Sequence, residues 1–428
     1  MRPFFVVLVA IASTSVFAQL QPAQQNALPL SPAEKQIAFV NAQIVKNPGK
    51  SNLYTELAIG LIRRERETCD KTLFDQSQVA LDKPLKLTPE NLEAQKAEAV
   101  LLIGKHEFAK ALVLAQSINK KIPDDVMSYG YIADADLALG DYADAEKEAQ
   151  WMLDIRAHNV PGLLRGAELR QLFGDSEGAL QFLNDAYQQT LPDQTEEIAW
   201  ILTRMAEINL STGKLDTADQ LLQKALASFP NYHRSLEVQA HVREAQHKYA
   251  EAADLLHLRN QHFPEPESIY AEAAALELAG NAQKANELYA SFERMAQAAS
   301  TLADNDNRDL IGFYISRKHN NSEALRVAHL AINQRHDIWT LDSYAMALHA
   351  SGDDLEAEKQ IERAMAPGVL DGDIFYHAAQ INAGLKNQAA AVRYLKLSLE
   401  TNPESEVSDT AREMLVKLAQ PEYGSARR

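Results

Sequence analysis

The sequence is poor in cysteine, in aromatic residues and in positive charge. It has one cysteine, 3 tryptophans and 7% aromatic residues in 428 positions. A single thiol cannot form an internal disulfide, so the fold must be stable without one. Lys and Arg number 42 against 59 Asp and Glu, which gives a net charge of −17. This charge disfavours binding to nucleic acid and to anionic membrane surfaces.

Long apolar runs are also missing after the N-terminus, which itself has the pattern of an export signal. A short basic start is followed by an apolar stretch at 4–17, and Ala18 offers a cleavage site before Gln19. The stretch is shorter than the about 20 apolar residues of a membrane-spanning helix. We therefore expect a signal peptide at 1–18, a disordered spacer at 19–30, and an exported protein, periplasmic or secreted. An uncleaved anchor is the alternative.

What the sequence does contain is an internal repeat. Nine alanines recur at a nearly constant interval of about 34 residues, and only the intervals before Ala218 and Ala324 are clearly longer. They are Ala111, Ala145, Ala179, Ala218, Ala252, Ala285, Ala324, Ala357 and Ala391. A glycine often stands five residues earlier, as at Gly140 and Gly174, and a proline twelve residues later, as at Pro230. Each unit is typical of helix, glycine turn and second helix, with the alanine where the two helices cross closely.

This pattern resembles the tetratricopeptide repeat, over roughly residues 49–404. The resemblance implies an all-α, right-handed superhelical solenoid of about ten helix hairpins, in which each repeat touches only its neighbours. Ser31-Pro32-Ala33-Glu34 is a helix start that predicts an N-terminal capping helix within 31–48. Residues 405–428 are expected to form a C-terminal capping helix and a tail.

The first repeat, which runs from Pro48 to Pro89, is longer than the others. We place the extra length between its two helices, as a longer turn or as a functional loop. The single cysteine, Cys69, lies in this segment. Its thiol is either partly buried and inert, or pairs with another chain or a partner.

The sequence shows no arrangement of residues that supports catalysis or a bound cofactor. Residues 174–178 match G-x-S-x-G, but Gly174 occupies the turn position of the repeat, so we interpret it as a repeat turn. Residues 304–309 (DNDNRD) superficially resemble a calcium loop and lack its glycine and glutamate. No two histidines are three or four residues apart, the spacing that suits a metal on one helical face. We therefore expect no enzyme, no metal and no cofactor.

The resemblance implies that the first helix of each repeat lines a concave groove, mainly through its second, fifth and ninth positions. These positions are mostly acidic or aromatic, with Lys96 and Arg234 as the main exceptions. They hold Asp134, Glu168, Trp200, Glu207, Glu237, Glu267, Tyr270, Asp306, Asp309, Trp339, Asp342, Asp373 and Tyr376. Either an acidic chain simply exposes carboxylates here, or these residues form an acidic, aromatic groove for a basic protein or peptide segment.

The sequence thus favours a non-enzymatic scaffold for protein–protein interaction in the bacterial cell envelope. Two alternatives stay open. One is a small-ligand carrier, which requires an enclosed apolar pocket. The other is an accessory subunit of an envelope enzyme or of a secretion complex.

Overall fold

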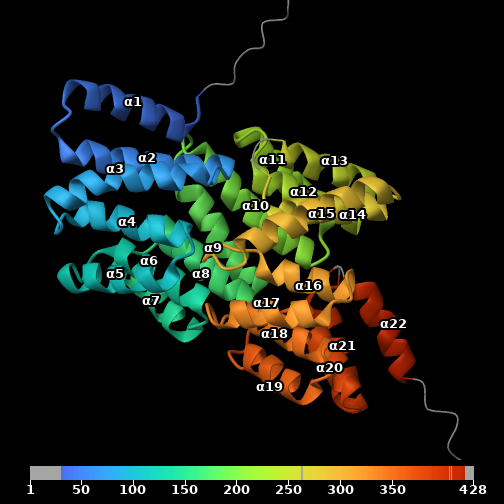
Figure 1. Ribbon diagram of the computed structural model, residues 1–428. Coiled ribbons are helices and arrows are strands. Elements are labelled where there is room, and N and C mark those ends of the chain that lie inside the picture. The colour runs from blue at the N-terminus through green and yellow to red at the C-terminus, as the bar shows by residue number, and fades with distance from the viewer. Residues whose placement is uncertain (1–29, 262–263, 404, 406, 420–428) are drawn as a thin grey trace, which may run out of the picture. The chain divides into compact units, whose positions relative to one another are not determined.

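The computed structural model describes residues 30–261, 264–403, 405 and 407–419. The predicted signal peptide (1–18), the spacer up to residue 29 and the tail from residue 420 lie outside the described residues. Within the described part the chain forms 22 α-helices and no β-strand, which confirms the all-α fold (Figure 1). No helix of this part is long and apolar enough to cross a membrane.

Twenty of these helices pair into ten successive hairpins, as the repeat pattern predicts. The first helices are α2 (Ser51–Thr68), α4 (Leu92–Gly104), α6 (Val126–Leu139), α8 (Val160–Leu172), α10 (Thr195–Ser211), α12 (His233–Ala245), α14 (Pro266–Leu278), α16 (Asn307–Ser316), α18 (Ile338–Ala350) and α20 (Gly372–Gly384). The second helices are α3 (Thr72–Leu87), α5 (Phe108–Lys121), α7 (Tyr142–Ile155), α9 (Ser176–Gln189), α11 (Leu215–Ser228), α13 (Tyr249–Asn260), α15 (Ala282–Ala299), α17 (Asn321–Ile332), α19 (Asp354–Met365) and α21 (Gln388–Thr401). One further helix stands at each end.

The two end helices are α1 (Pro32–Lys46) and α22 (Ser408–Ala419). The capping box that the sequence predicts at the start of α1 is present. The hydroxyl of Ser31 accepts a hydrogen bond from the Glu34 backbone N–H at 3.1 Å, and the Glu34 carboxylate accepts one from the Ser31 N–H at 2.8 Å. Two backbone donors at the helix end are thereby satisfied.

The nine repeated alanines lie where the helices of a hairpin cross. All nine are at most 1% exposed. A larger side chain at this position would force the two helices apart, because protein interiors are close-packed. In the first hairpin the same position holds Ser77, which is fully buried and donates a hydrogen bond to the Ala58 carbonyl at 3.1 Å.

The turn inside each hairpin needs a left-handed residue after the first helix. Gly140, Gly174, Gly213, Gly280 and Gly352 have φ between 73° and 98°, a region that glycine enters without strain. Five turns lack the glycine and still adopt this conformation. They use Cys69, His106, His247, His319 and Lys386, with φ between 49° and 62°.

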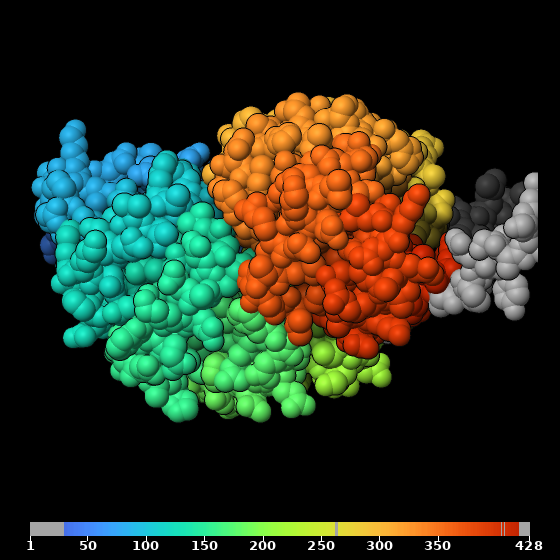
Figure 2. Space-filling model, turned by 90° about the horizontal axis from the view of Figure 1, so that it is seen from below, coloured from blue at the N-terminus to red at the C-terminus, as the bar shows by residue number. Residues whose placement is uncertain are grey.

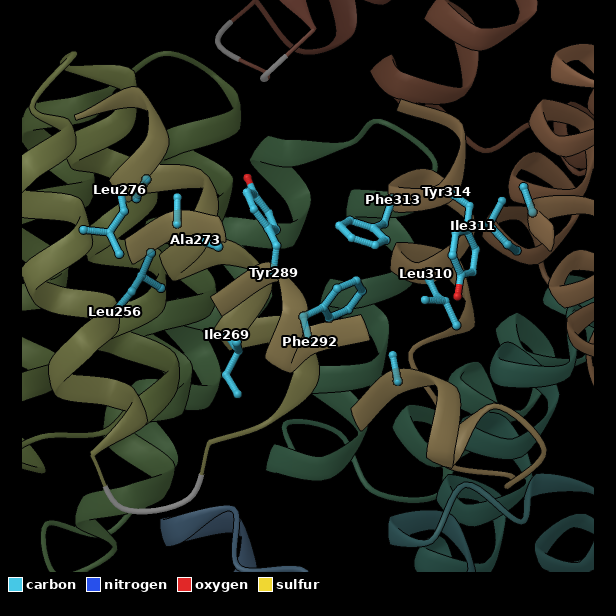
Figure 3. Close-up of a cluster of buried hydrophobic side chains, with 14 of the residues drawn as sticks. Leu256, Ile269, Ala273, Leu276, Tyr289, Phe292, Leu310, Ile311, Phe313 and Tyr314 are labelled. Carbon is cyan, nitrogen blue, oxygen red and sulfur yellow. The ribbon is translucent and has the colours of Figure 1, made fainter. Parts of the chain in front are cut away.

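A cluster of aromatic residues lies where α14, α15 and α16 pack together. The helix α15 is among the longest of the described chain, and the loop at 300–306 follows it, which accounts for the longer interval before Ala324. Figure 3 shows Tyr289 and Phe292 of α15 facing Phe313 of α16, with Tyr314 on the other side. The ring centres of Phe292 and Phe313 are 5.4 Å apart.

The extra length of the first repeat lies in its helices and not in a loop. α2 has 18 residues and α3 has 16, and only residues 69–71 separate them. Our placement of the extra length in the connection was therefore wrong. The segment "RRERET" continues α2, because it has no proline or glycine to end the helix before Cys69.

The hairpins do not touch only their neighbours, and this expectation was also wrong. The turns of the first four hairpins contact the loops that precede α14, α16, α18 and α20, each six hairpins further along. Lys71 lies 3.2 Å from Glu265, and His106 lies 3.2 Å from Asp304. The hydroxyl of Tyr142 accepts a hydrogen bond from Ile338 N at 3.0 Å. We call this line of contacts the seam.

The last contact of the seam is a backbone hydrogen bond, from Leu370 N to Leu172 O at 2.8 Å. Figure 2 shows the surface of α6 to α9, in teal and green, against that of α17 to α20, in orange and red. The buried side chains of this contact form one apolar cluster in which Leu137 and Phe173 pack with Ile338. Winding of the repeats thus brings together residues that are far apart in the sequence, such as Tyr142 and Ile338.

Candidate functional site

The predicted groove residues lie on one surface of the first helices, which we call the inner face. Several first helices of successive hairpins, such as α6 with α8 and α10 with α12, are in direct contact. The charge on Glu168 is affected by Asp134, Arg165, Arg204 and Glu207, so residues of three successive first helices lie close together. The structure therefore brings the acidic residues of α6, α8 and α10 together.

The exposure of the predicted residues differs along the inner face. Asp342 and Tyr376 are buried, Glu267 and Asp373 are exposed, and the others are half-buried. The half-buried ones are Asp134, Glu168, Trp200, Glu207, Glu237, Tyr270, Asp306, Asp309 and Trp339. A partner on this surface would meet partly covered side chains rather than freely exposed ones.

The aromatic residues of the inner face belong largely to the core. Trp200 packs against two buried clusters, one with α8 and α9 and one around Tyr232. Tyr270 contacts the rings of Tyr289 and Phe292 at centre distances of 5.5 and 4.9 Å. The indole N–H of Trp339 donates to Asp371 at 3.0 Å. These side chains hold neighbouring repeats together, whether or not they also contact a partner.

Arginines lie among the acidic residues of the inner face, and the sequence reasoning missed most of them. Arg165 forms an ion pair with Asp134, and Arg204 forms one with Glu207. Arg204 also donates to Gln171 of the preceding repeat at 3.0 Å. The sequence spacing identifies both arginines. Arg165 and Arg204 each precede a predicted glutamate by three residues, which places the arginine and the glutamate on one helical face.

Several carboxylates of the inner face hold their protons more tightly than in water. Burial raises the pKa of Glu168, in spite of the nearby Arg204. Burial, together with the charge of Glu267, raises the pKa of Glu237. For Asp306, burial and the charges of Asp309 and Glu267 raise the pKa to about 7. A desolvated carboxylate of this kind gains most from a cation that comes close.

The C-terminal part of the inner face contains a histidine–carboxylate pair. His377 Nδ1 lies 2.9 Å from both carboxylate oxygens of Asp342. Burial works against the charged imidazole, but the charge of Asp342 and its hydrogen bond raise the pKa of His377. His377 was not among the predicted residues, since it lies one position after Tyr376.

Cys69 lies at the seam beside His233. It ends α2 with φ 59°, and its Sγ is 3.1 Å from His233 Nδ1. Burial raises the pKa of the Cys69 thiol and lowers the pKa of His233 to about 4. Both groups are therefore uncharged at neutral pH, whereas a nucleophilic cysteine needs a thiolate. This favours the partly buried, inert thiol of the two alternatives.

The two motifs that resemble sites are parts of the repeat framework. In the G-x-S-x-G segment, Gly174 has φ 83° in the hairpin turn, and the Asp175 carboxylate caps α9 by accepting from Gly178 N at 2.8 Å. In the segment 304–309, Asn305 accepts from Asn307 N at 3.2 Å at the start of α16. Among the described residues no group of three His, Cys, Asp or Glu side chains is placed to hold a metal ion.

Ten stacked hairpins with a small residue at each crossing define an α-helical repeat protein. The period of about 34 residues and the left-handed turn five residues before the alanine make it a tetratricopeptide-repeat protein in fold. No protein-family model and no curated protein sequence matches the chain.

Solved structures with similar folds include a match over most of both chains. The human IFIT1 dimer with m7Gppp-AAAA matches with a TM-score of 0.51 at 15% identity, over 86% of this chain and 86% of that one. The APC/C hetero-tetramer Cut9–Hcn1 matches with a TM-score of 0.47 at 13% identity over 91% of this chain, which spans 60% of that chain's length. A tetratricopeptide repeat protein from Parabacteroides merdae matches with a TM-score of 0.42 at 16% identity, over 57% of this chain and 91% of that one.

Proposed function

We propose that the chain is a non-enzymatic scaffold that binds a basic segment of a protein or peptide on its inner face. The observation that carries this proposal is the set of half-buried carboxylates with raised pKa, Glu168, Glu237 and Asp306. A lysine or arginine of the partner would replace the proton as the counter-charge of such a group. Between α12 and α16 the four carboxylates of Glu237, Glu267, Asp306 and Asp309 outnumber Arg234 and Arg308, the two arginines whose charges interact with them.

The experiment is titration calorimetry of the chain with an acetylated octalysine peptide, in two buffers that differ in ionisation heat. We expect binding at low salt with release of protons at pH 6.5, because a bound cation lowers the pKa of these carboxylates. The double variant Glu237→Gln, Glu267→Gln should bind at least tenfold more weakly. Glu146→Gln on α7 is the matched control, since it removes one carboxylate from an exposed position of a second helix.

Binding that is as tight in the double variant as in the unchanged chain would refute the inner face as the site. The capped oligonucleotide m7Gppp-AAAA, which accompanies human IFIT1, is the comparison ligand. The acidic inner face should repel it. If it bound and octalysine did not, the scaffold would be a nucleic-acid binder instead.

We place this scaffold in the bacterial cell envelope, on the strength of the export pattern in residues 1–18. N-terminal sequencing of the protein from its native host should begin at Gln19. A protein that retains Met1 would speak against both cleavage and export. An accessory role in an envelope enzyme or secretion complex is a special case of the same scaffold.

The alternative of a small-ligand carrier has less support. The small cavity lined by Asp134, Arg165 and Glu168 has room for about one water molecule and no more. Ala133, Leu137, Ala145 and Leu169 also line this cavity, but sites for small ligands are many times larger.

A further inference from the structure

The α2–α3 turn lies across the N-terminal ends of four first helices of later hairpins. Arg66 forms an ion pair with Glu196 of α10 at 2.8 Å, and Cys69 contacts His233, the first residue of α12. Lys71 lies 3.2 Å from Glu265 at the start of α14 and 2.5 Å from Asp304 before α16. We call residues 63–71 the latch. The extra length of α2 is what allows the latch to reach this far.

The latch differs in chemistry from the rest of the seam. It contains ion pairs whose basic side chains, Arg66 and Lys71, are half-exposed, with exposed fractions of 50% and 45%. The contacts of α6–α9 with the loops before α18 and α20 are buried and apolar, with Tyr142 and Ile338 at most 3% exposed. Exposed ion pairs are weak and are screened by salt, whereas buried apolar contacts are not. The latch is therefore the part of the seam that opens most readily.

The latch also borders the acidic part of the inner face. Glu65 lies close enough to Arg234 for the two charges to interact, and the charge of Lys71 acts on Asp306 in the same way. Although burial alone would raise it, hydrogen bonds from His106 and Lys71 hold the pKa of Asp304 well below its usual range. Lys71 thus already acts as a cationic partner for carboxylates at the edge of the inner face.

We propose that the latch is an internal competitor of the basic partner, and that it must open before a cationic segment can reach the inner face of α12, α14 and α16. The inference rests on the proposed binding of a basic segment. Lys71 and Arg66 occupy Glu265, Asp304 and Glu196 in the closed state. A partner with several lysines or arginines displaces them and replaces their ion pairs with its own.

The first test measures opening without any ligand. Cys69 is the only thiol of the chain and is partly buried against His233 in the closed latch, so an increase in its reaction rate with a thiol reagent such as DTNB reports opening. We expect the labelling rate to rise about tenfold from 0.05 to 0.5 M NaCl with helix content unchanged. Lys71→Gln should raise the rate at least threefold at 0.05 M. Lys147→Gln, an exposed lysine of α7, is the matched control and should leave it unchanged. A rate independent of salt and of Lys71 would overturn the latch.

The second test closes the latch covalently. His233→Cys places a second thiol against Cys69, so that oxidation forms one disulfide and a reductant removes it. We expect the reduced variant to bind octalysine and the oxidised variant to bind it at least tenfold more weakly. The variant with both Cys69→Ser and His233→Cys has one thiol, and oxidation should not change its affinity. Equal binding by the oxidised and reduced forms would overturn the latch and leave the proposed function intact. Absence of binding in every form would refute the proposed function. The labelling test alone would then show whether the latch opens.

Discussion

At the scale of single residues, the inner face is a surface of paired charges rather than a uniform acidic wall. The acidic residues were predictable because they recur at fixed distances from the repeated alanines. Arg165 and Arg204 were missed because neither stands at a second, fifth or ninth position of the repeat, although each lies three residues before a predicted glutamate on the same helical face. The sequence alone also did not reveal that Trp200 and Tyr376 would be needed for packing.

Asp306 provides a direct test of desolvation at this surface. Its pKa is raised by burial and by Asp309 and Glu267 to about 7, so the folded state binds the proton more tightly than the unfolded state. The stability that this proton provides is complete below the unfolded pKa of about 3.9 and is lost as the pH rises towards 7. Asp306→Asn should therefore raise the stability by about 1 kcal/mol at pH 8 and change little at pH 4. Melting curves of both proteins from pH 4 to 8 measure this, and a gain that is the same at every pH would contradict it.

A substitution at Trp200 distinguishes a role in packing from a role in partner binding. It is half-buried between repeats, so Trp200→Ala should cost about 2–3 kcal/mol of unfolding free energy, somewhat less than truncation of a fully buried aromatic residue. Urea unfolding measures the loss. An unchanged stability together with a faster dissociation of octalysine would instead make Trp200 an anchor for the partner.

At the scale of elements, the helix hairpin is the unit that the sequence specifies best. The alanine at the crossing and the glycine in the turn are local requirements, and both recur in the order in which the chain uses them. The same local pattern misplaced the extra length of the first repeat. A polar segment such as residues 63–68 can form a helix as readily as a loop. Only the contacts of Arg66 and Lys71 explain why the helix continues here.

The turn glycines allow backbone strain to be separated from contact. At Gly352 a Cβ would meet nothing within 4 Å, so Gly352→Ala tests the positive φ of 88° alone and should cost about 1 kcal/mol. At Gly140 a Cβ would lie 2.9 Å from the His336 carbonyl oxygen, so Gly140→Ala should cost more because it also pushes the seam apart. Chemical denaturation of the two variants compares the losses. Equal losses would mean that the seam adapts to the added methyl group without cost.

At the scale of the whole described chain, the seam changes how the repeats depend on one another. In a solenoid with contacts between neighbours only, stability is a sum of local terms and the ends unfold independently. Here four early hairpins contact loops that lie six hairpins later. No periodic pattern in the sequence reveals these contacts, because they depend on the winding of many repeats. These contacts are therefore the part of the fold that could not be predicted from the sequence.

The hydrogen bond between Tyr142 and Ile338 tests this dependence across 196 positions. Ile338 N is the first donor of α18 and is buried, so Tyr142→Phe leaves it without its partner and should cost about 1–3 kcal/mol. If the seam couples the two halves, the variant should still unfold in one transition, at a lower urea concentration and with the same slope. Hydrogen exchange should accelerate not only in α18 but also in α6 and α7, where no residue other than Tyr142 was changed. Tyr187→Phe, on the partly exposed side of α9, is the control and should leave both unchanged. Faster exchange confined to α18, with an unaltered midpoint, would mean that the repeats are held by their neighbours alone.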